Sequence, residues 1–166
     1  LKLAAEKSNW GAPLGKRVGR GVGIQHVFGS YLATVAEVEV DGDGQVKVRR
    51  YTSAIDCGAV VNPDIVKQQV EGGLLFGLTA ALYGDITFAN GRVQQSNFHD
   101  YRALRINETP RIDVHIIRNN EKPGGVGEPG ATAAAPAFIN ALDDATGIRL
   151  RRLPIDRDVL AGRKKA

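Results

Sequence analysis

Cysteine is nearly absent from this sequence: Cys57 is the single one among 166 residues. One cysteine excludes an internal disulfide framework. Long apolar runs are missing too. No apolar run approaches the roughly 20 residues of a membrane span, so we expect no membrane-spanning segment. The chain begins Leu-Lys-Leu rather than with Met and shows no secretory signal, so we expect a processed chain or the C-terminal piece of something longer.

Concentrated positive charge is also scarce. The net charge of +4 would permit an acidic partner, but Lys and Arg are scattered except at residues 149–152 and 163–165. Scattered basic residues are typical of a solvated surface, so we expect no nucleic-acid partner.

The chain is 43% apolar and 24% charged, and its length predicts a single domain over residues 1–166.

Alternating apolar and polar residues predict three strands in the first third of the chain. They cover residues 21–28, 31–40 and 45–55, after the end of a helix at 1–8. The stretch Asp-Gly-Asp-Gly at 41–44 predicts a turn, and the three strands an antiparallel meander. A calcium loop is disfavoured there because the EF-hand Glu and flanking helices are missing.

A long helix is predicted from Asn62, a suitable N-cap, with Pro63 at the first helical position. The helical pattern continues for about 20 residues. Gly72, Gly73 and Gly77 lie inside it, and each costs roughly 1 kcal/mol relative to alanine. We therefore expect another part of the molecule to pack very close to this helix.

The second half of the chain adds shorter elements. The pattern predicts a hairpin at Asn90-Gly91, irregular structure at 96–110, a strand at 111–117, a helix at 133–147, a strand at 148–155 and a frayed basic tail at 156–166. Together these elements predict an α+β fold, with a mixed or antiparallel sheet and two packed helices.

The stretch GGVGEPG at 124–130 contains G-x-G-x-x-G, the pattern of a dinucleotide-binding loop. That fold requires a strand leading directly into the first glycine and an acidic residue about 20 positions later. Here the residues NNEKPG intervene, and the sequence from 148 is Ile-Arg-Leu-Arg-Arg. Glu128 would oppose a pyrophosphate, and Pro129 has no N–H to donate. This context makes nucleotide binding the weakest interpretation.

Alternatively, the glycines allow positive φ and close approach, and Glu128 projects from a tight turn near a helix start. A carboxylate among Gly, Val and Ala would be poorly solvated and could serve as a general base, or it could cap loop amides or the next helix. Gln68 and Gln69 are adjacent, so one must face inward if the helix packs. An amide beside Gly72 and Gly73 could bind a cofactor or a buried backbone group.

Other chemistries find little support. His26, His99 and His115 have no i,i+4 pairing and no HExxH pattern, so no zinc site is indicated. There is no G-x-S-x-G motif of a serine hydrolase. Cys57 follows an apolar strand, which favours a buried structural thiol over a nucleophile.

The order of three motifs resembles a known family. DCGAVVNPDIVKQQVEGG (56–73) is followed by ITFANGRVQQSNFHDY (86–101) and then by GVGEP (125–129). This set is similar to the C-terminal portion of the molybdopterin-binding large (beta) subunit of the xanthine dehydrogenase and aldehyde oxidoreductase family, of the isoquinoline 1-oxidoreductase type. The resemblance extends over about residues 10–155.

The resemblance implies an oxidoreductase that hydroxylates an aldehyde or N-heterocycle with water-derived oxygen. It implies that Glu128 is the base beside molybdenum, which takes a proton from a metal-bound hydroxyl. Gln69 and Gly127 are implied to contact the molybdopterin cofactor. The pterin holds the metal, so no protein ligand to it is expected.

Large subunits of this family are several times longer, so the resemblance implies that the chain is inactive alone. It would share the cofactor with the remaining part of the large subunit. Iron–sulfur clusters would lie on a small partner subunit, because the single cysteine of this chain cannot ligate such a cluster. A non-catalytic assembly module derived from the family is the alternative. Bacterial cytoplasm and periplasm are both compatible with the sequence.

Overall fold

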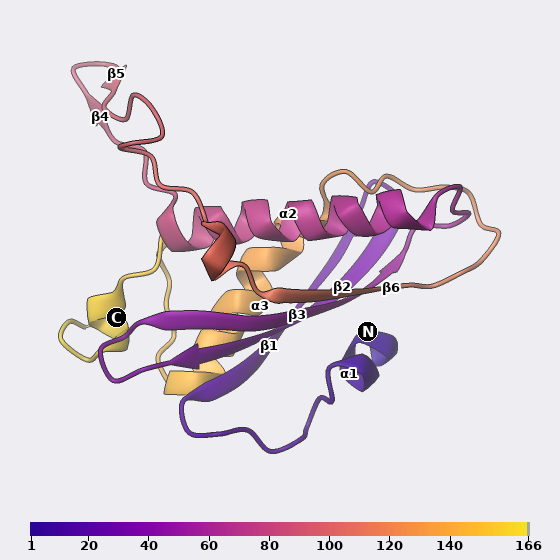
Figure 1. Cartoon of the computed structure of the whole chain (residues 1–166), viewed down its shortest axis with the longest axis horizontal. Coiled ribbons are helices and arrows are strands. Elements are labelled where there is room, and N and C mark those ends of the chain that lie inside the picture. The colour runs from indigo at the N-terminus through magenta and orange to yellow at the C-terminus, as the bar shows by residue number, and fades with distance from the viewer. Residues whose placement is uncertain (166) are drawn as a thin grey trace.

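The computed structural model describes residues 1–165 and is built around a four-stranded sheet (Figure 1). Its strands are β1 (Val18–Val27), β2 (Ser30–Val40), β3 (Val46–Asp56) and β6 (Arg111–Ile116), in the order β1-β2-β3-β6. The first three form the predicted antiparallel meander. Strand β6 pairs with β3 in parallel, so the sheet is mixed.

Two long helices pack on the sheet, α2 (Pro63–Tyr83) and α3 (Pro129–Thr146). Helix α3 lies against β1 and β2, and α2 packs on α3 and reaches β6. One continuous core of fully buried side chains, including Leu32, Tyr51 and Phe138, joins both helices to the sheet. The predicted α+β class, with a mixed sheet and two packed helices, is confirmed.

The predicted ends of the helices are largely confirmed. Oδ1 of Asn62 accepts from the backbone N–H groups of Asp64 and Ile65 at 3.0 and 3.2 Å, which caps α2. Helix α3 ends at Gly147, whose φ of 71° is the left-handed conformation expected after a helix. Its start is earlier than predicted, because Pro129 occupies the first helical position.

Close backbone approach holds the layers together. A Cβ on Gly19, Gly21 or Gly23 of β1 would collide with the backbone of α3. This contact lets the helix lie directly on the strand, which strand propensity alone does not predict. On α2, a Cβ on Gly73 or Gly77 would likewise collide with the backbone of α3. These two glycines show the close packing that was expected for this helix.

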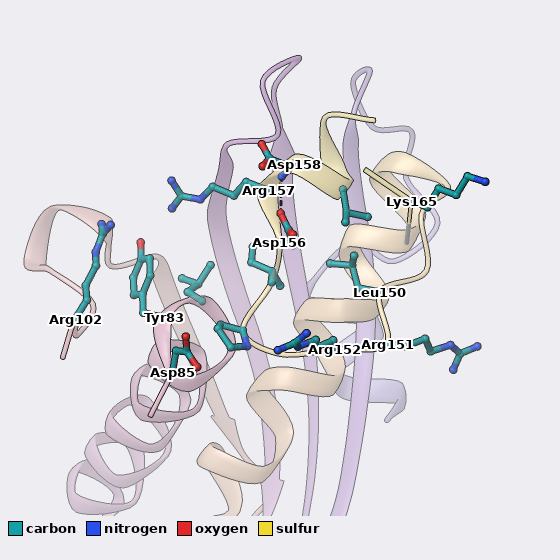
Figure 2. A pocket seen from close by; sticks show the side chains of 14 residues that line it. Tyr83, Asp85, Arg102, Leu150, Arg151, Arg152, Asp156, Arg157, Asp158 and Lys165 are labelled. Carbon is teal, nitrogen blue, oxygen red and sulfur yellow. Dashed lines mark hydrogen bonds between the residues drawn. The ribbon is translucent and has the colours of Figure 1, made fainter. Parts of the chain in front are cut away.

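The predicted strand at 148–155 is wrong. This segment contains no strand and crosses the C-terminal end of α2, where the backbone N–H of Ile155 donates to the carbonyl of Ala81 at 3.0 Å (Figure 2). Leu150 and Ile155 are buried there. Its alternating apolar residues therefore fill the core at the ends of the helices rather than pairing with a sheet edge.

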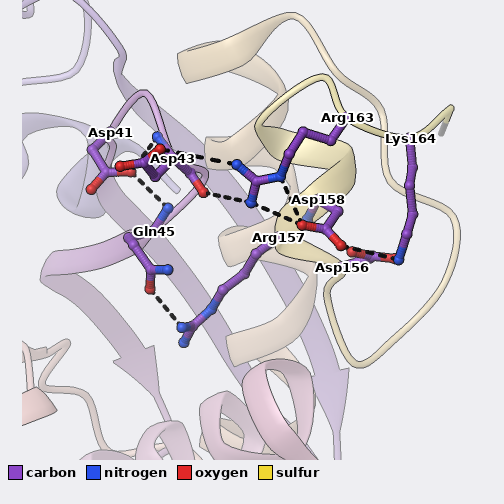
Figure 3. A network of polar contacts seen from close by, with 8 residues as sticks. All are labelled: Asp41, Asp43, Gln45, Asp156, Arg157, Asp158, Arg163 and Lys164. Carbon is purple, nitrogen blue, oxygen red and sulfur yellow. Dashed lines mark hydrogen bonds and ion pairs between the residues drawn. The ribbon is translucent and has the colours of Figure 1, made fainter.

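The tail at 156–165 folds, contrary to the prediction of fraying. Helix α4 (Arg157–Leu160) is capped by Asp156, and Val159 and Leu160 are buried. Two basic residues of the tail form ion pairs: Arg163 with Asp158, and Lys164 with Asp156 and Asp158 (Figure 3). Arg157 also donates to Gln45 beside the β2–β3 turn. Residue 166, also part of the predicted tail, lies outside the described residues.

Two peripheral elements complete the fold (Figure 1). Helix α1 (Lys2–Lys7) lies on β2 and β3, where Ala4 contacts a small apolar cluster. Strands β4 (Phe88–Ala89) and β5 (Arg92–Val93) form the predicted hairpin, on an arm that stands out from the body. A 3₁₀ helix, η1 (Ile106–Glu108), interrupts the region expected to be irregular. No helix in the described chain is both long and apolar enough to cross a membrane.

Candidate functional site

Gln69, Gly127 and Glu128 line one hollow of about 440 Å³ between α2 and the start of α3. The sequence placed these three residues in motifs far apart along the chain, and the fold brings them together. The rest of the lining comes from both helices and comprises Gly72, Gly73, Phe76, Ala131 and Thr132. We refer to this set of eight residues as the site hollow.

Helix α2 supplies one wall through its periodicity. Gln69, Gly72, Gly73 and Phe76 follow the spacing i, i+3, i+4, i+7 and so share a helix face. The neighbouring face carries the buried residues Val66, Val70 and Leu74 that anchor the helix in the core.

The loop before α3 supplies the opposite wall, and three hydrogen bonds hold it in place. The N–H of Gly124 donates to the carbonyl of Cys57 at 2.9 Å, and the N–H of Gly125 donates to the carbonyl of Phe28 at 2.8 Å. The hydroxyl of Ser30 donates to the carbonyl of Gly125 at 2.8 Å. The loop is thereby fixed to the β1–β2 hairpin and to the end of β3.

The glycines of GGVGEPG serve close approach, and none of them has positive φ. A Cβ on Gly124 would stand 2.6 Å from the carbonyl oxygen of Gly29, and one on Gly125 would stand 2.8 Å from the Cβ of Phe28. Gly127 differs, because no atom of residues 1–165 lies within 4 Å of its Cβ position. At Gly127 the open side faces the hollow.

Glu128 occupies the N-cap position of α3 but does not cap it with its side chain. Its carboxylate makes no hydrogen bond or ion pair with any residue in 1–165, so the structure does not show the capping role. The side chain is exposed, whereas the sequence predicted poor solvation. The difference arises because the facing wall on α2 includes Gly72 and Gly73, which have no side chain to cover a carboxylate.

Both glutamines are exposed, so the expectation that one of them faces the core is wrong. The amide of Gln69 lies at the site hollow and has no hydrogen-bond partner within the described residues. Gly72 also departs from the prediction of close packing: a Cβ there would have no described atom within 4 Å. A free carboxylate, a free amide and uncovered glycine backbone thus share one hollow.

Phe76 was missed by the sequence analysis. It is the largest side chain lining the site hollow and is 76% exposed. Its spacing of seven residues from Gln69 was the signal that could have placed it there.

The other chemical candidates are structural. Cys57 is 3% exposed, and burial, reinforced by the charge of Asp56, raises the pKa of its thiol. His26 stacks on Tyr31 across the hairpin, with ring centroids 4.2 Å apart. Within residues 1–165, no three His, Cys, Asp or Glu side chains are grouped to hold a metal ion.

A second hollow, of about 700 Å³, lies beside the C-terminal segment and contains none of the predicted site residues (Figure 2). Several of its charges are already paired within the chain. Arg102 pairs with Glu108 and stacks on Tyr83, and Asp156 and Asp158 pair with Lys164. The stacking on Tyr83 ties the arm to α2, whereas the pairs of Lys164 lie within the tail itself.

Comparisons with known proteins identify related sequences and folds. The family model described as "Molybdopterin cofactor-binding domain" matches residues 4–110, which include Gln69 and end before the loop that carries Glu128. A membrane-bound aldehyde dehydrogenase [pyrroloquinoline-quinone] of Gluconacetobacter polyoxogenes is 39% identical over 98% of this chain and 22% of its own length. Isoquinoline 1-oxidoreductase subunit beta of Brevundimonas diminuta is 36% identical over 100% of this chain and 22% of its own.

Solved structures give the same result. The aldehyde oxidoreductase of Desulfovibrio gigas superposes with a TM-score of 0.70 at 29% identity, covering 82% of this chain and 16% of that one. The chain thus spans about a fifth of the length of the curated relatives it matches. Because the family model covers more than half of the sequence, the chain belongs to the molybdopterin cofactor-binding domain family, as its resemblance to the xanthine dehydrogenase and aldehyde oxidoreductase large subunits implied.

Proposed function

We propose that this chain forms part of the active site of a molybdenum hydroxylase that oxidises an aldehyde or an N-heterocycle. The observation that supports the proposal is the site hollow, where Gln69, Gly127 and Glu128 meet in a molybdopterin-binding fold. Two relatives are named for an aldehyde and for isoquinoline, which supports both substrate classes.

The residues of the hollow fit a molybdopterin cofactor. The amide of Gln69 is unpaired within the described chain and offers both a donor and an acceptor to a polar ring edge. The open positions at Gly72 and Gly127 let a large planar group approach the backbone. The bound cofactor would supply the redox chemistry and the transfer of water-derived oxygen.

Glu128 is the general base in this proposal. Its carboxylate is free of partners within residues 1–165, so it can hold a proton at one of its two oxygens. The anchored loop and the start of α3 fix its position opposite α2. A base that is positioned before the substrate arrives needs no rearrangement during the reaction.

The remaining part of the large subunit and an iron–sulfur small subunit would complete the enzyme. The short coverage of the relatives supports this, because about four fifths of their length lies outside this chain. The alternative, an assembly module without catalysis, predicts a stable complex that contains no molybdenum. Because one relative is named for pyrroloquinoline quinone, molybdenum, pterin and quinone should all be measured in the purified assembly.

Replacing Glu128 by Gln in the assembled enzyme tests the base. Loss of a positioned base should lower kcat on the order of 10² or more while molybdenum content stays constant. Glu121→Gln is the matched control, because Glu121 is an exposed glutamate of the same loop that does not line the hollow. Turnover of the Glu128→Gln enzyme within a few-fold of wild type would refute the assignment.

A further inference from the structure

Phe76 is an unusual lining residue for the site hollow. It is 76% exposed, although it lies in the middle of the 21-residue helix α2. The opposite wall contributes only Gly127, Glu128, Ala131 and Thr132, none of which is aromatic. Nothing in the hollow therefore offers the ring of Phe76 an aromatic partner.

The position of Phe76 relative to the polar groups indicates what could cover it. Seven residues of α-helix separate it from Gln69, a rise of about 10 Å, so it lies two turns away from the amide proposed to bind the cofactor. It shares the hollow with Glu128, the proposed base. A molecule that extends from Glu128 along this wall would meet the aromatic ring.

The size and chemistry of the hollow fit a small planar molecule. Its volume of about 440 Å³ lies within the range of small-molecule sites. Aromatic rings pair with other conjugated rings in offset or edge-to-face arrangements and gain affinity beyond simple burial.

We infer that Phe76 forms an aromatic wall against which the planar ring of the substrate packs, so that the site favours aromatic heterocycles and aromatic aldehydes over small aliphatic aldehydes. This inference rests on the proposed function and narrows its substrate class. The conjugated pterin could present the same chemistry, and the experiment separates these two sources.

The test uses the assembled enzyme with its redox centres already reduced, so that bound substrate is not oxidised, and measures the Kd of isoquinoline by calorimetry. Phe76→Ala should raise that Kd by a few-fold to about tenfold, the size of one aromatic pair, and Phe76→Leu by less. Phe98→Ala is the matched control, because Phe98 is 82% exposed and does not line the hollow. It should leave the Kd unchanged. With an acceptor present, Phe76→Ala should lower kcat/KM for benzaldehyde more than for acetaldehyde.

Several results would overturn the inference. They are an unchanged isoquinoline Kd in both Phe76 variants, an equal increase in Phe98→Ala, or no measurable isoquinoline binding by the wild-type enzyme. Loss of bound pterin in Phe76→Leu, with an unchanged Kd in the loaded fraction, would assign the ring contact to the cofactor instead. If Phe76→Ala does not assemble, Phe76→Leu alone decides.

The binding measurement is independent of the base. Normal turnover by Glu128→Gln together with a raised Kd in Phe76→Ala would refute the proposed base and leave the aromatic wall standing. Failure of the two proposals can thus be distinguished.

Discussion

Gly73 of α2 and Gly130 of α3 lie in direct backbone contact. A Cβ on Gly73 would stand 3.0 Å from the Cα of Gly130, and a Cβ on Gly130 would stand 3.1 Å from the Cα of Gly73. This contact sets the distance between the helix that carries Gln69 and the helix that begins after Glu128. The geometry of the site hollow therefore depends on two residues that have no side chain.

We expect Gly130→Ala to destabilise the protein. Its added methyl would stand 2.9 Å from the backbone nitrogen of Leu74, and overpacking of this kind typically costs about 1–3 kcal/mol. Chemical denaturation measures the loss in the free energy of unfolding. Gly42→Ala is the control, since its Cβ would meet no described atom within 4 Å. Equal stability of the two variants would argue against the close helix contact.

Gly72→Ala should have the opposite effect on stability. Gly72 lies in the interior of α2 with open space around its Cβ position, so alanine should stabilise the helix by up to about 1 kcal/mol. The same methyl projects into the site hollow and should lower molybdenum content or kcat. Thermal unfolding and metal analysis of the assembled enzyme check both effects. A variant that gains stability and keeps full activity would contradict this expectation, because the hollow would then accommodate a methyl group at Gly72.

Asp113 should contribute to stability at neutral pH and lose that contribution in acid. Burial acts to raise the pKa of its carboxyl, but hydrogen bonds and charge from Arg50 and Arg111 outweigh it, and the pKa is lowered. The lowered pKa stabilises the fold above the ordinary carboxyl value near 4, and this contribution disappears as the pH falls through the folded-state value.

Replacing Asp113 by Asn should therefore cost on the order of 1 kcal/mol at pH 7 and progressively less as the pH falls below the ordinary carboxyl value near 4. The key contact is the donation from Nε of Arg50 on β3 to Asp113 on β6, at 2.6 Å. Denaturation at a series of pH values measures the difference. Asp85→Asn, at an exposed carboxylate with no hydrogen bond to the described chain, is the control. A constant difference from pH 7 to pH 3 would contradict the assignment.

Much of the fold is determined by local sequence. The alternation at 21–28, 31–40 and 45–55 corresponds to β1, β2 and β3, because a period of two allows only one face of a strand to face the core. Asn62 and Pro63 fix the start of α2 through hydrogen bonding and backbone geometry that involve only neighbouring residues. The ordered motifs likewise indicate the family from the sequence alone.

The incorrect predictions concern segments whose structure depends on contacts with residues far away in the sequence. The alternation at 148–155 is compatible with a strand, but the segment packs into the core beside α2 instead of pairing with a sheet edge. The tail folds because Val159 and Leu160 are buried. Two of its basic side chains, Arg163 and Lys164, also form ion pairs with carboxylates. Neither the sheet edge nor these partners can be identified from the segment alone.

By itself, the sequence determined the first three strands, the start of α2 and the end of α3, and it indicated the three residues proposed for the site, since short-range geometry and ordered motifs specify them. Tertiary structure alone decided that Gln69 and Glu128 line one hollow, that Gly72 is open where Gly73 is packed, and that Phe76 joins them. The physical reason is the glycine contact between α2 and α3. Which backbones approach each other depends on the packing of the whole core, and no local pattern specifies it.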